Sequence, residues 1–286
     1  MSLHIIFSTH SSLMYLRKII PFLGITSLLL LLTVATQAQI SVSKMFNNGM
    51  VLQRDIEIPI WGWGEVGTEV SVTFADSVRT TSVDSNGKWK VYFPAKVAGG
   101  PYTMQITSGA QSYSYSDILI GDVFLVTGQS NMEWRLSSAT GGSSEATTAN
   151  FPQIRQFKIP KATSTQISDK LSSGTWSKAN SYSSTAAFSA VAYYFAKDIY
   201  AQTGIPIGLI NNTYGGARIE AFMSEQMLGY DETGRVIGSG VTEQQPTLIY
   251  NKMVHPILQA RYKGWLWYQG ETNGYYSVDA LAYEEQ

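Results

Sequence analysis

The stretch that decides the fold is residues 118–132, ILIGDVFLVTGQSNM. Residues 118–126 are almost all apolar, and a short apolar run of this kind predicts a buried β-strand. Directly after it come a glycine, an amide and a serine, Gly128-Gln129-Ser130. The end of a buried strand is a common place for an exposed nucleophilic hydroxyl. Ser130 is therefore the candidate nucleophile.

Two further polar loops follow predicted strands. Residues 214–218, YGGAR, come after the strand 205–210, and residues 270–273, GETN, come after the strand 264–269. Apolar residues at helical spacing within 188–199 predict a helix between strands. This alternation predicts a parallel sheet with right-handed crossovers, and ligands bind beyond the carboxyl ends of such strands. The three loops are therefore expected at one edge of an α/β sheet.

Two other segments of this region have weaker signals. Apolar residues within 248–258 predict a second helix, kinked or broken near Pro256. Residues 136–186 are rich in Ser, Thr and Gly and show little periodicity. Within them, residues 140–144, TGGSS, lack the lysine and the spacing of a phosphate-binding loop. They predict a surface loop near the site.

The region before this sheet has a different pattern. Across residues 39–116 apolar and polar residues alternate, as in residues 70–74, and residues 84–87, DSNG, indicate a turn. Several short strands without a helical stretch predict a small β-sandwich domain over this range, followed by the α/β domain over residues 117–286. Residues 61–64, WGWG, favour packing and a bend over sugar binding.

Residues 1–38 have the pattern of a secretory signal peptide. Arg17-Lys18 precedes an apolar stretch that is short for a membrane span, and small residues precede Gln39. The chain contains no cysteine, which excludes disulfides and a lipid-anchored cysteine. We expect a periplasmic or secreted bacterial protein that has no membrane contact after its leader is removed.

The composition argues against one class of partner and leaves another open. The formal net charge is −1, with 14% charged residues, so nothing favours nucleic-acid binding, which needs a clustered basic surface. Aromatic residues make up 12% of the chain. They suit stacking against sugars, and they are equally typical of β-rich structure. The oligomeric state stays open.

A serine hydroxyl becomes a good nucleophile only when a base takes its proton and donors face the developing oxyanion. Ser130 can supply its own backbone N–H, Gly215 or Gly216 another, and Asn273 a side-chain amide. Each donor of this kind contributes about 10²–10³ in rate. Taken singly, these signals are more typical of turns and caps. Their coincidence at three strand ends favours a catalytic site.

At this point the residues resemble a known family, the sialate O-acetylesterases of the SGNH hydrolase superfamily. Its motifs are matched by residues 128–134, GQSNMEW, and residues 267–273, WYQGETN. Shorter stretches agree from about Met45 onward, among them residues 50–54 and 206–211. The resemblance implies a flavodoxin-like SGNH domain with a β-sandwich in front of it. It also implies hydrolysis of acetyl esters on sialic acid or related sugars, without metal or cofactor.

The resemblance assigns roles residue by residue. Ser130 matches the nucleophile, Gly216 or alternatively Gly215 the oxyanion glycine, and Asn273 the asparagine of the third motif. Related acetyl xylan esterases make Glu271 a secondary candidate, as an acid partner of the histidine. Arg218 departs from the family pattern, and a surface salt bridge is favoured for it over a contact with the sialate carboxylate.

The sequence has no match to the family motif that supplies the general base. The family's Asp-x-x-His motif lies downstream of the third motif and has no match here. Outside the leader the sequence has one histidine, His255, ahead of the strand 264–269 and therefore at the wrong end of the sheet. We expect an incomplete SGNH domain with little or no turnover on its own, because a general base contributes about 10²–10⁴ in rate.

Two alternatives stay open at this stage. The first keeps the chemistry and changes the substrate to acetylated xylan or another glycan. The second is a non-catalytic glycan-binding protein that keeps the pocket without the base. The intact loop around Ser130 favours an enzyme, because a binding protein has no need of a nucleophile.

Overall fold

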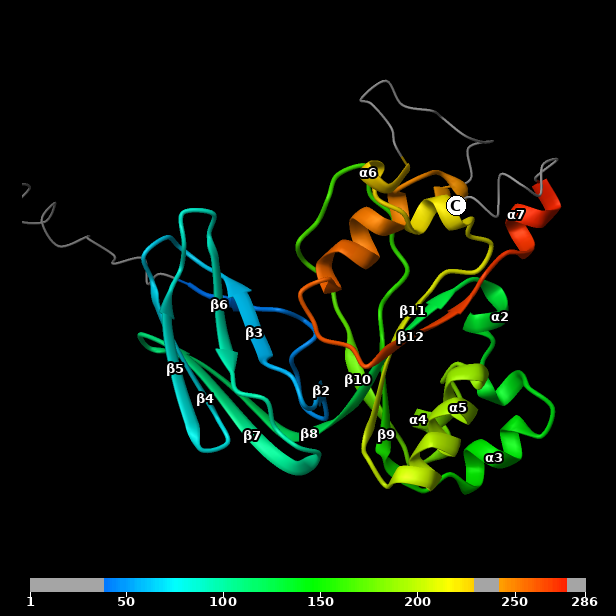
Figure 1. Ribbon diagram of the computed structural model, residues 1–286, viewed down its shortest axis with the longest axis horizontal. Helices are drawn as coiled ribbons and strands as arrows, with labels where there is room; N and C mark the ends of the chain where they lie inside the picture. Colours follow the sequence, from blue (N-terminus) through cyan, green and yellow to red (C-terminus); the bar gives the residue numbers. More distant parts are fainter. Residues whose placement is uncertain (1–38, 229–241, 277–286) are drawn as a thin grey trace, which may run out of the picture. The chain divides into compact units, whose positions relative to one another are not determined.

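Strand β8 (Gln111–Gly128) runs through both halves of the structure. In the computed structural model, which describes residues 39–228 and 242–276, its first half pairs with the antiparallel strand β7 (Gly99–Ser108) (Figure 1). Its second half pairs with the parallel strands β11 (Ile207–Thr213) and β12 (Gly264–Tyr268). The change of partner falls between Ile120, the last residue paired with β7, and Asp122, the first residue paired with β11. The predicted boundary between two domains thus falls inside one continuous strand, and the division itself stays a prediction.

The N-terminal half is built from antiparallel strands that alternate between buried and exposed residues, as in β4 and β6. The strands of one sheet are β4 (Glu69–Phe74), β5 (Ser77–Ser82), β7 and β8, joined by the short parallel strand β2 (Val51–Gln53). A second sheet contains β1 (Ser41–Val42), β3 (Ile58–Trp63) and β6 (Lys88–Phe93). Phe74 meets Phe93 edge to face, with ring centroids 5.5 Å apart, so the sheets bury their apolar faces against each other.

The C-terminal half is α/β, as predicted. β9 (Phe151–Lys158) and β8 flank β11 in parallel, and β10 (Thr175–Ala179) pairs antiparallel at the edge. The predicted helix is present as α5 (Ala190–Thr203). The Ser189 hydroxyl accepts a hydrogen bond from Ala192 N at its start, and Gly204 ends it with a φ of 65°.

Two expectations for this half need comment. The predicted break near Pro256 is confirmed, because a π-helical turn there passes directly into a 3₁₀ turn. Residues 136–186 are more regular than their composition indicates, since they contain β9 and β10 as well as two short α-helices and a 3₁₀ turn. The remaining short helices are α2 (Ser130–Glu133), η1 (Leu136–Ser138), α3 (Gly142–Thr148), α4 (Tyr182–Thr185), η2 (Ile219–Phe222), α6 (Glu225–Leu228), η3 (Thr242–Gln244), η4 (Tyr250–Val254), η5 (His255–Ile257) and α7 (Glu271–Tyr276).

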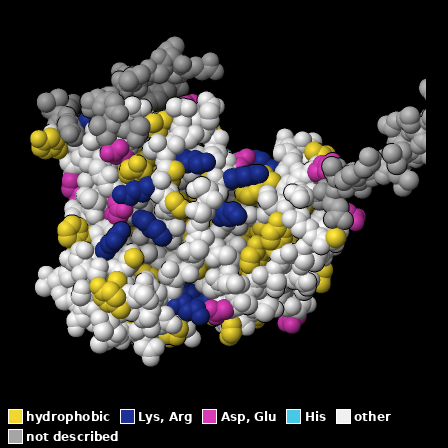
Figure 2. All heavy atoms as spheres, turned by 180° about the vertical axis from the view of Figure 1, so that it is seen from behind, with side chains coloured by type: hydrophobic (Ala, Val, Ile, Leu, Met, Phe, Trp, Pro, Cys, Tyr) yellow, Lys and Arg dark blue, Asp and Glu magenta, His cyan; other side chains and the backbone are white. Residues whose placement is uncertain are grey.

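The surface carries both signs of charge. Figure 2 shows Lys and Arg side chains gathered across the middle of one face, with carboxylates and small apolar groups among them. Ion pairs join separate elements, for example Lys178 to Asp117 at 2.7 Å and Lys88 to Asp169 at 2.7 Å. The predicted leader, residues 1–38, lies outside the described residues. Among the residues that are described, no helix is long and apolar enough to cross a membrane.

Gly128 provides a test of how β8 and β12 meet. A Cβ atom at this residue would lie 2.0 Å from the Tyr268 carbonyl oxygen, and its φ of 145° is unfavourable for any other residue. We expect Gly128→Ala to lower the free energy of unfolding by about 3 kcal/mol or more. The control is Gly109→Ala, with a φ of 55° and nothing within 4 Å, which should cost about 1 kcal/mol. Equal losses in urea denaturation would contradict the close approach.

Candidate active site

The structure brings the three predicted loops to one edge of the sheet. Gly128 is in register with Thr213 on one side and with Tyr268 on the other, so β8, β11 and β12 end at the same level. Backbone hydrogen bonds join the loops as they leave the sheet: Tyr214 N donates to Gly128 O at 2.9 Å, and Gln129 N donates to Tyr268 O at 3.0 Å. The expectation of a shared edge is confirmed.

Gln129 holds the first and third loops together. Its side chain is 3% exposed, and its Oε1 accepts hydrogen bonds from Gly270 N at 3.4 Å, Thr272 N at 3.2 Å and Gln269 Nε2 at 3.2 Å. These donors surround one buried oxygen, so the third loop is positioned by a side chain of the first. No role for Gln129 was predicted from the sequence. An amide side chain directly before the candidate nucleophile was the available signal.

Ser130 is the first residue of helix α2, and its side chain is exposed. Gly215 of the second loop lies against it: a Cβ atom at Gly215 would stand 3.7 Å from the Ser130 Cβ and 3.0 Å from Glu133 Oε2. A Cβ atom here would be tight against the Glu133 carboxylate and in ordinary van der Waals contact with Ser130. The main chain of the second loop can approach a group bound at Ser130 because it carries glycine here.

The two glycines of the second loop differ in what their N–H groups do. Gly215 N donates to Glu133 Oε2 at 2.9 Å and is already occupied. Gly216 has a φ of 81°, and among the described residues its N–H has no hydrogen-bond partner. Of the two alternatives, Gly216 is thus the one with a free donor.

Asn273 and Glu271 both lie in the first turn of α7 and have different surroundings. Asn273 is 5% exposed; its Nδ2 donates to Glu220 Oε2 at 2.9 Å, and its Oδ1 accepts from Ile219 N at 3.0 Å. It joins the third loop to the second and keeps one further amide hydrogen. Glu271 is exposed and accepts a hydrogen bond from the Asn131 side chain, next to Ser130.

A charged cluster beside Ser130 was not foreseen. Lys158, the last residue of β9, donates to Thr213 Oγ1 at 2.7 Å and to Asn211 Oδ1 at 2.9 Å. Its Nζ is 3.9 Å from Glu133, which Lys161 binds more closely at 2.8 Å. Burial lowers the pKa of Lys158 to about 8, although the Glu133 carboxylate opposes the shift. The sequence offered no way to place Lys158, because β9 lacks a clear periodic pattern.

His255 lies away from the three loops. It begins η5, where its Nδ1 is 3.3 Å from the Ser168 carbonyl oxygen and 3.6 Å from Asp169 Oδ1. It is the one histidine among the described residues, and its polar contacts are with Ser168 and Asp169 and not with Ser130. Those same residues contain no group of three His, Cys, Asp or Glu that could hold a metal ion.

Residues 120–286 match the model of a protein family described as "Carbohydrate esterase, sialic acid-specific acetylesterase". The chain belongs to this family. Two curated relatives are named sialate O-acetylesterase: that of Homo sapiens is 31% identical over 83% of this chain, and that of Mus musculus is 30% identical over 91% of it. A crystal structure described as a novel carbohydrate acetylesterase from Xanthomonas citri aligns with a TM-score of 0.80 and 40% identity over 86% of this chain.

These matches also define how much of each relative is compared. The chain spans about half the length of the curated relatives, 50% of the human protein and 57% of the mouse protein. It covers 54% of the Xanthomonas citri structure. The mixed α/β fold and membership of a carbohydrate esterase family follow from the comparison. The roles of Ser130, Gly216, Asn273 and Glu271 remain proposals.

The buried oxygen of Gln129 gives a stability prediction. Gln129→Ala leaves the partly buried N–H groups of Gly270 and Thr272 without their acceptor, and a lost partner costs up to about 1–3 kcal/mol for each donor. We expect the free energy of unfolding to fall by about 2–4 kcal/mol. Urea denaturation measures the change, with the exposed Gln166→Ala as control. A loss no larger than the control's would contradict the assigned role.

Lys158 gives a prediction about pH. Its folded-state pKa of about 8 lies below the ordinary value of about 10.4, so between these values the unfolded chain binds more protons. The cost of burying the charge is fully present below pH 8 and disappears as the pH rises. We expect the parent protein to gain stability relative to Lys158→Met between pH 8 and about pH 10.4. A difference in the free energy of unfolding between the parent and Lys158→Met that stays constant over this pH range would contradict the prediction. The same pH dependence in the control variant Lys161→Met would also contradict it.

Proposed function

We propose that the chain carries the nucleophile and the oxyanion donors of a serine acetylesterase that removes O-acetyl groups from sialic acid. The observation that carries the proposal is the position of Ser130, exposed at the start of α2 and packed against Gly215. Gly216 follows with a free N–H, and Gln129 and Asn273 hold the surrounding loops in place through buried hydrogen bonds. A nucleophile beside preorganised donors is the arrangement that acyl transfer requires.

The reaction would run in two steps. The Ser130 hydroxyl attacks the acetyl carbonyl carbon while a base takes its proton, and the carbonyl electrons move onto oxygen. The N–H groups of Ser130 and Gly216 and the amide of Asn273 would receive this oxyanion. Its collapse breaks the bond to the sugar oxygen, which leaves as an alkoxide and takes the proton from the base, and the acetyl group stays on the serine. Water then attacks this ester, so that acetate leaves and the serine is restored.

The proton acceptor is proposed to lie outside the described residues. His255 contacts Ser168 and Asp169 instead of the loops around Ser130. Glu271, which binds Asn131, would be a secondary participant as the acid partner of a histidine. For these 286 residues alone we therefore expect turnover far below that of a complete triad. Oxyanion donors without a complete triad still leave about 10³–10⁴ over water.

The sugar is proposed on the names of the relatives. Two mammalian relatives are called sialate O-acetylesterase, and the Xanthomonas citri protein is called a carbohydrate acetylesterase. Acetylated xylan or another acetylated glycan is the alternative substrate. Together with the pattern of residues 1–38, this function fits a periplasmic or secreted protein that works on glycans outside the cytoplasm.

Rescue by imidazole tests the proposal on the chain as it stands. Free imidazole can act as the general base in place of a histidine, so it should raise acetate release from O-acetylated sialic acid by at least about tenfold, part of the 10²–10⁴ that a general base contributes. Ser130→Ala should abolish this increase, and the exposed Ser138→Ala should retain it. The same assay with acetyl xylan compares the two substrate classes.

Each result bears on a separate part of the proposal. An equal increase in the Ser130→Ala variant would exclude Ser130 as the nucleophile. Full turnover without imidazole, lost in Ser130→Ala, would show that the chain holds its own base. Faster release from acetyl xylan than from O-acetylated sialic acid would reassign the substrate. Binding of the acetylated sugar with no release under any condition would favour a non-catalytic glycan-binding protein.

A further inference from the structure

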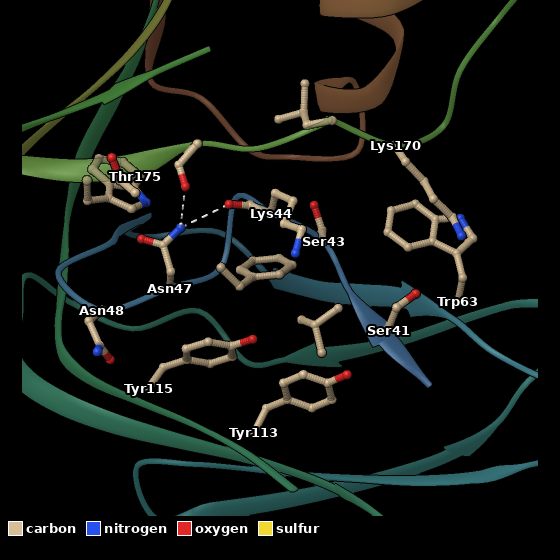
Figure 3. A pocket seen from close by; sticks show the side chains of 15 residues that line it. Ser41, Ser43, Lys44, Asn47, Asn48, Trp63, Tyr113, Tyr115, Lys170 and Thr175 are labelled. Carbon is tan, nitrogen blue, oxygen red and sulfur yellow. Dashed lines mark hydrogen bonds between the residues drawn. The ribbon is translucent and has the colours of Figure 1, made fainter. Parts of the chain in front are cut away.

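A second cavity is lined by residues of both halves and includes none of the three loops of the candidate active site. It has a volume of about 620 Å³ and is shown in Figure 3. Its walls come from the segment after β1, from the start of β8 and from the segment before β10. A cavity of this size holds one or two sugar rings, since small-molecule sites measure about 300–1,000 Å³.

The first wall is aromatic. Tyr113 and Tyr115 are two residues apart in β8, so their side chains lie on the same face of the strand and line one side of the cavity. Trp63 lines another side (Figure 3). Burial raises the pKa of Tyr115 to about 12. The Tyr113 hydroxyl donates to Ile40 O at 2.9 Å, whereas the Tyr115 hydroxyl has no partner among the described residues. A half-buried tyrosine hydroxyl ordinarily has a hydrogen-bond partner. Because the Tyr115 hydroxyl has none within the described residues, it is available to a ligand.

The second wall is held rigid by hydrogen bonds to the segment before β10. Asn47 Nδ2 donates to Lys44 O at 2.9 Å and to Gly174 O at 3.3 Å. Trp176 Nε1 donates to Met45 O at 3.0 Å. The wall that presents these side chains is therefore formed before any ligand binds, which lowers the entropic cost of binding.

The charge of the lining is of one sign. Two lysines line the cavity, Lys44 and Lys170, and no Asp or Glu does. Neither ammonium group forms an ion pair within residues 39–228 and 242–276, although Lys170 lies over the Trp63 ring at 4.8 Å from its centroid. Two cations without a facing carboxylate favour an anionic ligand, and aromatic faces with hydroxyl and amide groups favour a sugar ring.

From these observations we infer that the cavity is a second binding site, for a pyranose sugar that carries a carboxylate. Lys44 and Lys170 would pair with the carboxylate, and Tyr115 would contact the ring and donate to a sugar hydroxyl. Thr175, which lines the cavity, is paired with Lys158 of the neighbouring strand β9, at the sheet edge where β8 ends before Ser130. Three strand spacings separate β10 from β8, roughly 14 Å.

Sugars without any O-acetyl group test the inference, because their binding involves no ester chemistry. The probes are N-acetylneuraminic acid and glucuronic acid, with glucose as the neutral comparison, titrated by calorimetry at 50 mM and 500 mM salt. We expect both acids to bind more tightly than glucose, by about tenfold at low salt, and this preference to shrink at high salt, because salt screens exposed charges.

Variants assign the binding to the cavity. Lys44→Gln combined with Lys170→Gln should remove the preference for the acids, and the conservative Tyr115→Phe should weaken all three sugars by a smaller factor. The control is Lys96→Gln, since Lys96 also lies over an aromatic ring, at 5.8 Å from Tyr102, and does not line the cavity. It should change nothing. Thermal unfolding of each variant establishes that it is folded.

Three results would overturn the inference. The first is no binding of either acid at about 20 mM, roughly 10⁴-fold above a micromolar dissociation constant. The second is equal binding of glucose and the acids, and the third is binding that the lysine and Tyr115 variants leave unaltered. None of them bears on Ser130, so a failure here is distinguishable from a failure of the proposed esterase function.

Discussion

At Gly128 the backbones of β8 and β12 lie so close together that a single added carbon would stand 2.0 Å from the Tyr268 carbonyl oxygen. The candidate site depends on this constraint. With the strands in contact, Gln129 N reaches Tyr268 O, and the chain turns directly into α2. The turn leaves Ser130 exposed at the edge of the sheet. A side chain at residue 128 would separate the strands and move the first loop away from the third.

Buried side-chain amides then join the three loops through hydrogen bonds. The Gln129 side-chain oxygen accepts hydrogen bonds from two N–H groups of the third loop. Asn273 forms hydrogen bonds with the Glu220 side chain and with Ile219 N, which follow the second loop. Such hydrogen bonds are strong in a low-dielectric interior and costly to break. They fix the loops before any substrate arrives, and donors that need no rearrangement stabilise an oxyanion most effectively. Glu133 adds a charged contact by holding Gly215 N while Lys158 and Lys161 balance its carboxylate.

Local signals predicted the parts of the fold that local forces determine. The buried strand before Ser130, the helix that ends at Gly204 and the break near Pro256 each have a pattern that the structure confirms. The meeting of three loops at one edge followed from the rules of parallel sheets. Strand β9 was missed because its burial depends on neighbouring strands, and its sequence, FPQIRQFK, mixes polar and apolar residues without a period.

Contacts between segments that lie far apart in the chain could not be predicted from local sequence patterns. Lys158 reached the vicinity of Ser130 only through β9, and nothing in its own neighbourhood indicated Glu133 as a partner. The continuity of β8 through both halves depends on pairing with strands far apart in the chain. For residues 61–64 the sequence favoured packing over sugar binding. Trp63 is indeed 8% exposed, and the same side chain contributes to the wall of the second cavity.

The central claim is that Ser130 becomes acetylated. Incubation with 4-nitrophenyl acetate and imidazole, an acid quench and peptide mass spectrometry would locate the acetyl group directly, whatever the rate of its later hydrolysis. The account predicts one acetyl group on the peptide that contains Ser130, absent from the Ser130→Ala variant. Acetylation spread over surface lysines, with Ser130 unmodified, would contradict it.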